Sequence, residues 1–414
     1  MRTFSLGAIL LLCLVVLIVD ILSFYWLESI TQLLEPHFLK ISLNILFWLF
    51  TIGLISSIII LKIRLDYINP SRKHLWISSF YGLTVSSFIP KLLFVIIISI
   101  LYFTNYVFSF TESILLIPFV GLLSGFLPFF VILYGIFKAA YRYKIYHQTL
   151  LFKNLPDSFT NTRIVQISDI HLGSFNYRYH ILERAIEKIN HLKPDFIFIT
   201  GDLINNFSWE LRGWRTVFEN LSAKKMKIAV LGNHDYGDYS KWNSEEEKQE
   251  NFEALKQFYK EIDFKLLLNE ALVIKKENDE IAIIGIENWG KHPFKNYSDL
   301  KKAMNEVSHI PFKILLSHDP THWEAEVLKK TDIAITFSGH THGMQAAFQY
   351  RNLKWSPIKF KYKHWAGLYK KNKQFLYVNR GLGWLGFPGR IGMRPEITLI
   401  DISKEKVSSS DSNF

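Results

Sequence analysis

The sequence predicts a membrane domain of four helices followed by an α/β domain, and two observations support this fold class. Four long apolar stretches crowd the first third of the 414-residue chain: about 4–24, 41–62, 76–102 and 114–137. Beyond residue 160, short apolar runs rich in β-branched residues alternate with loops that contain Gly, Asp and His. Short runs of this kind are typical of buried strands in α/β domains.

The four apolar stretches are each long enough to cross the hydrocarbon core of a bilayer, which takes about 20 helical residues. The first lacks a small-residue cleavage site and three more follow it, so we expect a retained helix and not a signal peptide. Residues 1–140 are therefore predicted to form a transmembrane domain. Asp20 and Lys91 lie within these spans, where lone charges are costly, and we expect them to pair; the alternative is that each reaches the outer interface separately.

Loop charges predict the orientation of this domain. Eight basic residues flank the spans on one side: Arg2, Lys62, Arg64, Arg72, Lys73, Lys138, Arg142 and Lys144. The other side carries Lys40 and the acidic residues Glu28, Glu35 and Glu112. Because short basic loops stay in the cytoplasm, both termini and the α/β domain are expected there, in an integral protein of the inner or cell membrane.

Cysteine content and charge limit the expected partners. Cys13 is the single cysteine, so no disulfide forms within the chain. Much of the net charge of +11 lies beside the membrane spans, and no zinc-finger, RNA-recognition or helix-turn-helix pattern accompanies it. We therefore expect the lipid bilayer as a partner and no nucleic acid.

The α/β domain is predicted to occupy residues 161–403, after a juxtamembrane linker at 141–160 and before a flexible tail at 404–414. Eight runs are expected to form its strands: 163–168, 195–200, 227–231, 281–286, 313–317, 332–337, 375–378 and 396–400. Between the first two runs, apolar residues recur at helical spacing from Ile181 to Leu192, and Pro194 ends the segment. This pattern indicates the crossover helix of a βαβ unit.

Five short motifs carry the candidate chemistry of this domain: Asp169-Ile170-His171, Gly201-Asp202, Gly232-Asn233-His234-Asp235, Ser317-His318-Asp319 and Gly339-His340-Thr341-His342. They supply oxygen and imidazole donors, which suit borderline divalent metals and not a thiolate site. Most of them fall where predicted strands end, the edge at which open α/β sheets place their sites. The sequence therefore predicts a metal site at this edge.

With these motifs, the chain resembles the calcineurin-like metallophosphoesterase superfamily over roughly residues 160–402. The resemblance is closest to the bacterial membrane-linked branch, and four segments carry it: 168–173, 232–237, 338–343 and the late 379–381 with 394–396. It implies a four-layer αββα metallophosphoesterase sandwich after the four-helix transmembrane domain. Some members of this branch, the UDP-diacylglucosamine pyrophosphatase type, cleave the pyrophosphate of a UDP-linked acylated glucosamine, and many have no assigned substrate.

Carried over motif by motif, the resemblance implies two divalent metal ions, with Mn2+ expected and Fe2+ or Zn2+ as alternatives. One ion would be bound by Asp169, His171, Asp202 and His342. The other would be bound by Asp202, Asn233, His318 and His340. Asp202 would bridge the ions because a carboxylate has two oxygens, and Asn233 would add a neutral oxygen that limits the negative charge facing a phosphate.

His234 is the expected catalytic residue. Two ions close together would hold the phosphate oxygens and acidify a water, so that a metal-bound hydroxide attacks phosphorus. His234 would then donate or position the proton for the leaving oxygen, since histidine titrates near neutral pH. Many family members have a carboxylate three residues after the Gly-Asp aspartate to orient this histidine. Here that residue is Asn205, whose amide accepts a hydrogen bond without adding negative charge, and Asp235 is expected to tie down its own loop.

Two later segments have open interpretations. Arg380 and Arg394 are candidate substrate-binding residues because guanidinium groups suit phosphate, but a turn-rich connector between the last two predicted strands, with solvated charges, explains them equally well. In residues 354–365, basic and aromatic side chains alternate, as in a segment that lies on an anionic membrane surface. The alternative is a loop that packs its aromatic side chains on the sheet.

The sequence thus predicts a membrane-anchored hydrolase of a phosphodiester or pyrophosphate, with a phosphorylated and lipid-linked substrate. One alternative is a phosphodiesterase that acts on a soluble substrate and is merely held at the membrane. The other is a non-catalytic membrane scaffold with a decayed site, although the complete set of candidate ligands argues against decay.

Overall fold

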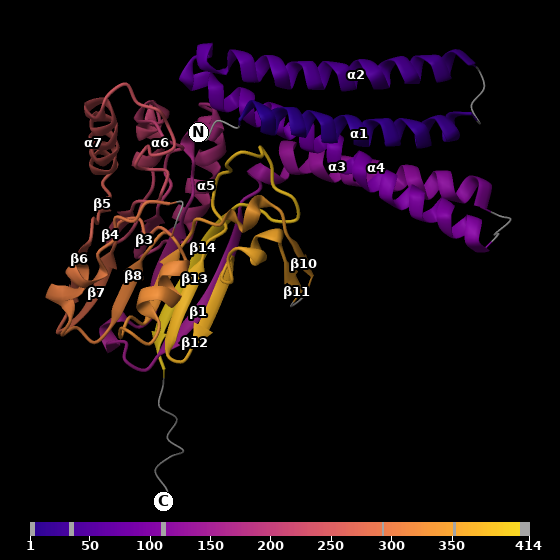
Figure 1. The fold of residues 1–414 in the computed structure, drawn as a ribbon. Helices are drawn as coiled ribbons and strands as arrows, with labels where there is room; N and C mark the ends of the chain where they lie inside the picture. Colours follow the sequence, from indigo (N-terminus) through magenta and orange to yellow (C-terminus); the bar gives the residue numbers. More distant parts are fainter. Residues whose placement is uncertain (1–4, 33–36, 109–112, 292–293, 351–352, 406–414) are drawn as a thin grey trace, which may run out of the picture. The chain divides into compact units, whose positions relative to one another are not determined.

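A computed structural model describes residues 5–32, 37–108, 113–291, 294–350 and 353–405 (Figure 1). The chain divides into two compact units. The helical unit contains residues 2–138 with 386–389, and the α/β unit contains residues 139–385 with 390–414. Apart from Lys404 and Glu405, the predicted flexible tail lies outside the described residues.

Four long helices make up the helical unit: α1 (Leu6–Thr31), α2 (His37–Arg64), α3 (Pro70–Phe108) and α4 (Ser113–Phe137). They contain the four predicted apolar stretches, and by length and composition each can cross a membrane. Many of their Leu, Ile and Phe side chains are exposed, as expected for helices whose surroundings are lipid and not water.

The interior of the helical unit holds an ion pair. Asp20 of α1 is fully buried, and its Oδ1 lies 2.8 Å from the Nζ of Lys91 in α3. The other carboxylate oxygen of Asp20 accepts a hydrogen bond from the Thr51 hydroxyl of α2. The predicted pairing of Asp20 with Lys91 is therefore confirmed, and three helices contribute to it.

Two six-stranded sheets form the α/β unit. The first has the order β1 (Lys144–Phe152), β14 (Glu396–Lys404), β2 (Thr162–Ile167), β3 (Phe196–Thr200), β4 (Met226–Val230) and β5 (Lys265–Leu266). The second has the order β12 (Gly367–Lys371), β13 (Gln374–Val378), β9 (Ile335–Ser338), β8 (Lys313–Leu316), β7 (Asp279–Gly285) and β6 (Glu270–Lys276). Strands β2 to β5 are parallel neighbours, and so are β7, β8, β9 and β13.

The strands alternate their side chains between two cores. In β3, Phe196 and Phe198 pack between the two sheets, whereas Ile197 and Ile199 face a helical layer. That layer consists of α5 (Tyr179–His191), α6 (Arg215–Glu219) and α7 (Glu245–Glu261). The outer face of the second sheet packs on α8 (Leu300–Met304) and on short helical turns at 305–307 and 323–327. The four-layer αββα prediction is confirmed, because both sheets are apolar on both faces.

One predicted boundary differs from the structure. Residues 144–152, expected within the juxtamembrane linker, form β1, which pairs in parallel with β14 from Lys144 opposite Glu396 to Phe152 opposite Lys404. Leu150 and Phe152 are buried between the sheets, while most of the strand is exposed or half-buried. An edge strand needs few apolar residues, so its sequence lacks the buried-strand pattern.

A two-stranded hairpin, β10 (Phe348–Tyr350) with β11 (Leu353–Trp355), lies outside both sheets (Figure 1). It follows the His340–His342 motif directly in the chain. No strand was predicted for these residues or for β5, β6 and β12, which are short or lie at sheet edges.

Candidate metal centre

The candidate ligands lie in five loops, each directly after a strand. Asp169 and His171 follow β2, and Asp202 follows β3. The remaining loops follow β4, β8 and β9 and carry Asn233, His234, His318, His340 and His342. Because these strands are parallel neighbours within their sheets, their carboxyl ends meet at one edge of each sheet and bring the loops together.

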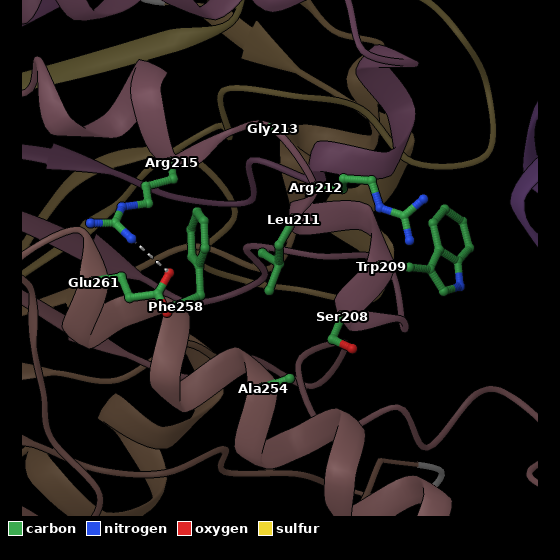
Figure 2. Close-up of a pocket in the computed structure, with 9 residues that line it drawn as sticks. All are labelled: Ser208, Trp209, Leu211, Arg212, Gly213, Arg215, Ala254, Phe258 and Glu261. Atoms are coloured by element: carbon green, nitrogen blue, oxygen red, sulfur yellow. Dashed lines mark ion pairs between the residues drawn. The ribbon is translucent and has the colours of Figure 1, made fainter.

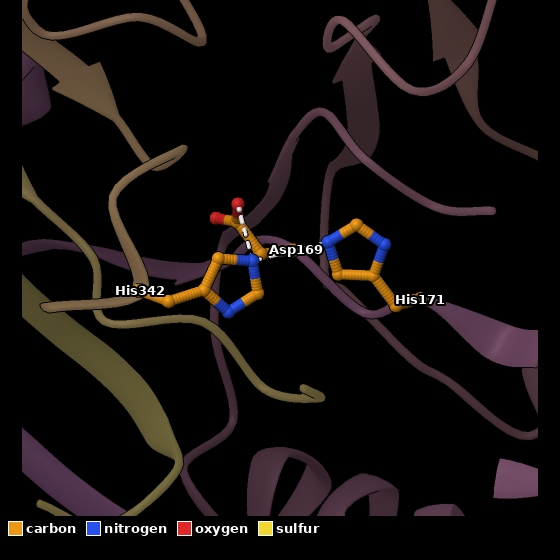
Figure 3. Close-up of side chains that lie close together, drawn as sticks. All are labelled: Asp169, His171 and His342. Carbon is orange, nitrogen blue, oxygen red and sulfur yellow. Dashed lines mark hydrogen bonds and ion pairs between the residues drawn. The ribbon is translucent and has the colours of Figure 1, made fainter. Parts of the chain in front are cut away.

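One cluster consists of Asp169, His171 and His342, and Figure 3 shows their side chains around a common centre. The Nε2 of His342 lies 3.2 Å from Asp169 Oδ1 and 3.0 Å from His171 Nε2. All three side chains are buried. Two imidazole nitrogens and a carboxylate oxygen this close together can donate their lone pairs to one shared cation.

A second cluster consists of Asp202, His318 and His340. The Nε2 of His318 lies 3.2 Å from Asp202 Oδ2 and 3.3 Å from His340 Nδ1. Asn233 joins this cluster, because its Oδ1 lies 2.7 Å from the same His340 nitrogen. The structure thus divides the seven predicted ligands into the two expected groups.

Asp202 lies between the two clusters. Its Oδ2 is 3.2 Å from His318 Nε2 and 3.7 Å from His171 Nε2. Its Oδ1 accepts a hydrogen bond from the backbone N–H of His234 at 2.9 Å. We expected each carboxylate oxygen of Asp202 to face one ion. In the structure, Oδ2 faces both clusters, and Oδ1 is hydrogen-bonded to the loop that carries His234.

The backbone around the ligands is strained. Asp169, His171, Asp202, His340 and His342 all have positive φ angles, between 48° and 71°. Non-glycine residues rarely adopt this left-handed conformation, and each such residue costs of order 1–3 kcal/mol. Five of them in one site indicate that the fold holds these side chains in place against local preference, as is common at functional sites.

Gly339 permits the close approach of two of these loops. A Cβ atom at this position would lie 2.3 Å from Asp169 Oδ2 and 2.0 Å from Ser168 Oγ. Any side chain at residue 339 would therefore displace the Asp169 carboxylate, which explains why glycine precedes His340.

The pKa shifts of the site residues indicate that the two clusters bind additional positive charge. Burial raises the pKa of Asp169 to about 7, and the nearby Asp202 carboxylate adds to this shift. Burial also acts to raise the pKa of Asp202, but His318 and His234 lower it well below its usual value. Burial acts to lower the pKa of His318, but Asp202 and Asp169 outweigh it and raise it to about 10. A cation in each cluster would provide the compensating charge that a proton on His318 otherwise gives, so the residues present fit two divalent metal ions.

The His234 ring is held by a backbone carbonyl. Its Nδ1 lies 2.7 Å from the Asn205 carbonyl oxygen, so Nδ1 carries the proton and Nε2 is the basic nitrogen. We expected the Asn205 side chain to accept this bond, but the described residues include no hydrogen-bond partner for its amide oxygen. Burial lowers the pKa of His234, against the opposing effects of Asp202 and the Asn205 carbonyl.

Two buried carboxylates support the ligand loops. Asp235 accepts backbone hydrogen bonds from Gly232, Asp202, Leu203 and Ile204, at 2.8 to 3.3 Å, so the prediction that it ties down its loop is confirmed. Glu210 accepts backbone hydrogen bonds from four other residues: Gly173, Asn205, Asn206 and Phe207. The role of Glu210 was not predicted: three of its partners lie in its own loop, and the fourth, Gly173, comes from the loop after β2.

Tyr362 orients a ligand histidine. Its hydroxyl lies 2.7 Å from His340 Nε2, and its side chain is 6% exposed. With Nε2 held by this hydroxyl, the His340 Nδ1 faces Asn233 and His318. An outer hydrogen bond of this type sets the ring orientation and basicity of a metal ligand. Sequence reasoning missed this role, although it identified the segment 354–365.

The two arginines proposed for substrate binding have structural partners. Arg380 is 5% exposed, with its Nη1 2.5 Å from Glu396 Oε2 and its guanidinium 4.3 Å from the centre of the Tyr146 ring. Arg394 donates to the backbone carbonyls of Arg142 and Tyr143. These contacts offer no support for phosphate binding, and the buried, ion-paired Arg380 also differs from the solvated charge that the connector interpretation expects.

A surface pocket of about 470 Å³ lies elsewhere in the α/β unit, between the turn at 208–211, α6 and α7 (Figure 2). Arg215 and Glu261 form an ion pair at its wall, 3.8 Å apart. None of the candidate metal ligands lines this pocket.

Comparison with known proteins agrees with this geometry. Residues 162–344 match the family described as calcineurin-like phosphoesterase. Residues 2–140 match the family described as probable calcineurin-like phosphoesterase, transmembrane domain.

Several curated proteins are similar to this chain over about 60% of its length. A transmembrane protein with metallophosphoesterase domain from Danio rerio is 30% identical over 64% of this chain and 59% of its own length. Its Bos taurus counterpart is 30% identical over 59% of this chain and 53% of its own. The uncharacterized metallophosphoesterase YkuE of Bacillus subtilis (strain 168) is 28% identical over 60% of this chain and 81% of its own. The chain therefore spans little more than half the length of the two animal relatives. It carries a calcineurin-like phosphoesterase domain at residues 162–344, preceded by a transmembrane domain of the phosphoesterase type at residues 2–140.

Proposed function

We propose that this protein is a membrane-anchored, dinuclear metal-dependent hydrolase of a phosphodiester or pyrophosphate. The observation that carries the proposal is the position of Asp202, whose single oxygen Oδ2 faces the histidines of both clusters. A bridging carboxylate is needed only where two ions lie side by side. Mn2+ is the metal we propose first, because the donors are carboxylate, amide and imidazole without sulfur.

Each cluster would hold one ion. Asp169, His171, Asp202 and His342 would hold the first, and Asp202, Asn233, His318 and His340 the second. When bound, such a pair of ions binds phosphate oxygens and lowers the pKa of a water molecule enough for it to react at neutral pH. The protein contributes the fixed positions of these ligands, which Asp235, Glu210 and Tyr362 support through backbone and ring hydrogen bonds.

His234 would handle the proton of the leaving oxygen. Its Nδ1–H donates to the Asn205 carbonyl, which leaves Nε2 as the atom that exchanges a proton with the substrate. Its backbone N–H also donates to Asp202, so the loop that positions this ring is attached to the bridging ligand. No covalent enzyme intermediate is required, and none of the described residues around the clusters supplies an obvious nucleophile.

We further propose a lipid-linked phosphate as the substrate and the cytoplasmic side of the membrane as the location of the α/β unit. The excess of basic residues on one side of the spans supports the orientation. The transmembrane helices in the same chain support a substrate that resides in the bilayer, because they keep the protein in the membrane where such a substrate is found. The domain bounds of 1–140 and 161–403 belong to this proposal, with β1 added to the catalytic domain.

The test is hydrolysis by the purified full-length protein in detergent. We expect a bis-aryl phosphodiester to be cleaved when Mn2+ is present and not after chelation with EDTA. A panel of nucleotide-linked lipids and matched soluble nucleotides then separates the lipid-linked substrate from the soluble alternative. A protein that binds metal but cleaves no phosphoester in either panel would be the non-catalytic scaffold.

A further inference from the structure

An unusual group of exposed apolar side chains lies just after the His340–His342 motif. Met344, Phe348, Leu353, Trp355 and Phe360 are 41–81% exposed. The other exposed large apolar side chains described in the α/β unit are scattered over separate elements: Ile145, Leu151, Tyr177 and Val273. We call the five side chains between residues 344 and 360 the hairpin face.

The register of the hairpin places three of these side chains on one side. Phe348 pairs with Trp355, and Gln349 pairs with Lys354, so Phe348, Leu353 and Trp355 point to the same side of the two-stranded ribbon. Lys354 points to the opposite side, where its Nζ donates to the Ala366 carbonyl at 2.7 Å and lies 4.6 Å from the centre of the Tyr369 ring. The hairpin is thus fastened to the α/β unit through Lys354, and its apolar side is turned away from that attachment.

Positive charge accompanies the hairpin face. The Nζ of Lys359 lies 5.3 Å from the centre of the Phe360 ring and 5.9 Å from that of Trp355. Residues 344–365 contain four lysines and one arginine and no acidic residue. Aromatic and aliphatic side chains interleaved with lysine suit the boundary between lipid headgroups and acyl chains, where the apolar part is buried and the ammonium meets anionic headgroups.

We propose that the hairpin face binds the anionic surface of the lipid bilayer and brings bilayer-embedded phosphate substrates to the metal centre. Two observations favour a bilayer over a protein partner. The basic and apolar composition complements anionic lipid, and the same chain carries four helices able to span a membrane, so a bilayer is always within reach. The delivery of substrate rests on the proposed function, whereas the lipid contact itself does not.

The hairpin face is joined directly to the metal centre. Ser356 Oγ donates to the Gly343 carbonyl at 2.9 Å, and Thr341 Oγ1 donates to the Trp365 carbonyl at 2.7 Å. Between these two contacts, Tyr362 reaches His340 Nε2. Residues 354–365 were interpreted either as a membrane-surface segment or as a loop packed on the sheet. Tyr362 and Trp365 are buried, as the packed loop requires, whereas Trp355 and Phe360 are exposed, as a membrane-surface segment requires. A lipid headgroup held at this face lies next to the loop that carries two metal ligands.

The lipid contact is tested without reference to activity. An environment-sensitive fluorophore is attached at Phe360→Cys in full-length protein whose single native cysteine is changed by Cys13→Ala. The protein is reconstituted in vesicles of phosphatidylcholine, with or without phosphatidylglycerol. We expect spin-labelled lipid to quench this fluorophore, more strongly when phosphatidylglycerol is present and less at high salt. The matched control is Val273→Cys, an exposed apolar position on β6, where quenching should be weak.

Equal quenching at residues 360 and 273 would overturn the proposal. So would protection of the residue-360 fluorophore that depends on protein concentration and persists in detergent, because this would identify a second copy of the chain as the occupant. Either result would refute the lipid contact, whether or not the protein hydrolyses a phosphoester.

Substrate delivery is tested with the double variant Leu353→Glu/Phe360→Glu. It should lower turnover of an aryl phosphodiester carried on a vesicle-embedded lipid about tenfold or more, because two apolar anchors are lost. Hydrolysis of the soluble bis-aryl phosphodiester should be unchanged, as should both activities of the control Val273→Glu. Equal loss on both substrates would show that the hairpin supports the site itself and would refute delivery. If the wild-type protein cleaves neither substrate, the proposed function fails, and the fluorescence result alone decides the lipid contact.

Discussion

At the scale of single residues, hydrogen-bond partners decide what each candidate side chain can do. His234 illustrates this, since its Nδ1 is engaged by a backbone carbonyl and not by a carboxylate. The carbonyl fixes the tautomer without adding a full negative charge, so the imidazolium form gains little stabilisation. Because His234 belongs to neither cluster of candidate ligands, proton delivery through its Nε2 remains our proposal for this residue.

His234→Ala should leave both metals bound while turnover falls roughly 10²–10⁴-fold, the range for a lost acid–base group. The defect should shrink for substrates with acidic leaving groups, which need little protonation. Comparing kcat for a nitrophenyl and a phenyl or alkyl leaving group measures this. A slowdown of the same size for both would show that His234 is not the proton donor.

Tyr362→Phe removes one hydroxyl, and with it the hydrogen bond to His340 Nε2. Metal affinity should fall about 10–100-fold, while kcat at saturating metal should stay near that of wild type. Titration of the metal-free protein with Mn2+, followed by activity, separates these quantities. Tyr177→Phe, on an exposed ring of the same unit, is the matched control. A variant with unchanged Mn2+ affinity would exclude a role for Tyr362 in orienting His340.

The sequence could predict the candidate ligands that the fold brings together, but not the residues that position them. The candidate ligands lie in short motifs whose residue types can bind metals, as in Gly339-His340-Thr341-His342. Tyr362 contacts His340 across 22 residues of sequence, and Glu210 joins its own loop to that of Gly173, so neither a tyrosine nor a glutamate alone carries a pattern that shows its role. Their roles became visible only once the tertiary contacts were known.

At the scale of elements, strands buried on both faces were predicted and strands at edges were not. β3 is buried at every position and apolar from Phe196 to Ile199, so its sequence pattern is strong. β1 buries only Leu150 and Phe152, and its residues were expected to belong to the juxtamembrane linker. The physical difference is that a central strand needs two apolar faces, whereas an edge strand needs only part of one.

Glu210 governs the geometry of the loop that follows β3. Glu210→Ala leaves four backbone N–H groups without their acceptor, so the α/β unit should lose about 1–3 kcal/mol of unfolding free energy. Turnover should fall as well, because the Asn205 carbonyl that holds His234 belongs to this loop. Thermal unfolding and kcat measure the two effects, with the exposed Glu250→Ala as control. A stable variant with wild-type kcat would contradict this role.

The helices of the membrane unit are connected by the Asp20–Lys91 pair, which joins α1 to α3. Breaking a buried pair on one side leaves an uncompensated charge and costs about 3–5 kcal/mol. Asp20→Asn and Lys91→Met should therefore each lower the thermal midpoint in detergent, and Asp20→Lys combined with Lys91→Asp should recover most of the loss. Purely additive effects in this cycle would mean that the two charges act independently.

At the scale of the whole molecule, the chain joins a membrane unit to a metallophosphoesterase sandwich. Hydropathy alone predicted the spans, because a bilayer requires long apolar helices, and the family resemblance predicted the four-layer αββα sandwich. The grouping of Gly386–Gly389 with the helices could not be predicted. That short segment interrupts the α/β unit in sequence, and Ser78 of α3 donates to its Gly386 carbonyl at 2.7 Å.

The central claim is that two ions share the ligand Asp202. The direct measurement is the metal content of full-length protein loaded with Mn2+, for wild type and for Asp202→Ala, alongside hydrolysis of the bis-aryl phosphodiester. We expect two ions per chain and Mn2+-dependent hydrolysis in the wild type. Asp202→Ala should retain neither ion after gel filtration and should be inactive, because one oxygen serves both clusters. An active Asp202→Ala protein, or a wild-type protein that is active with a single ion, would contradict the account.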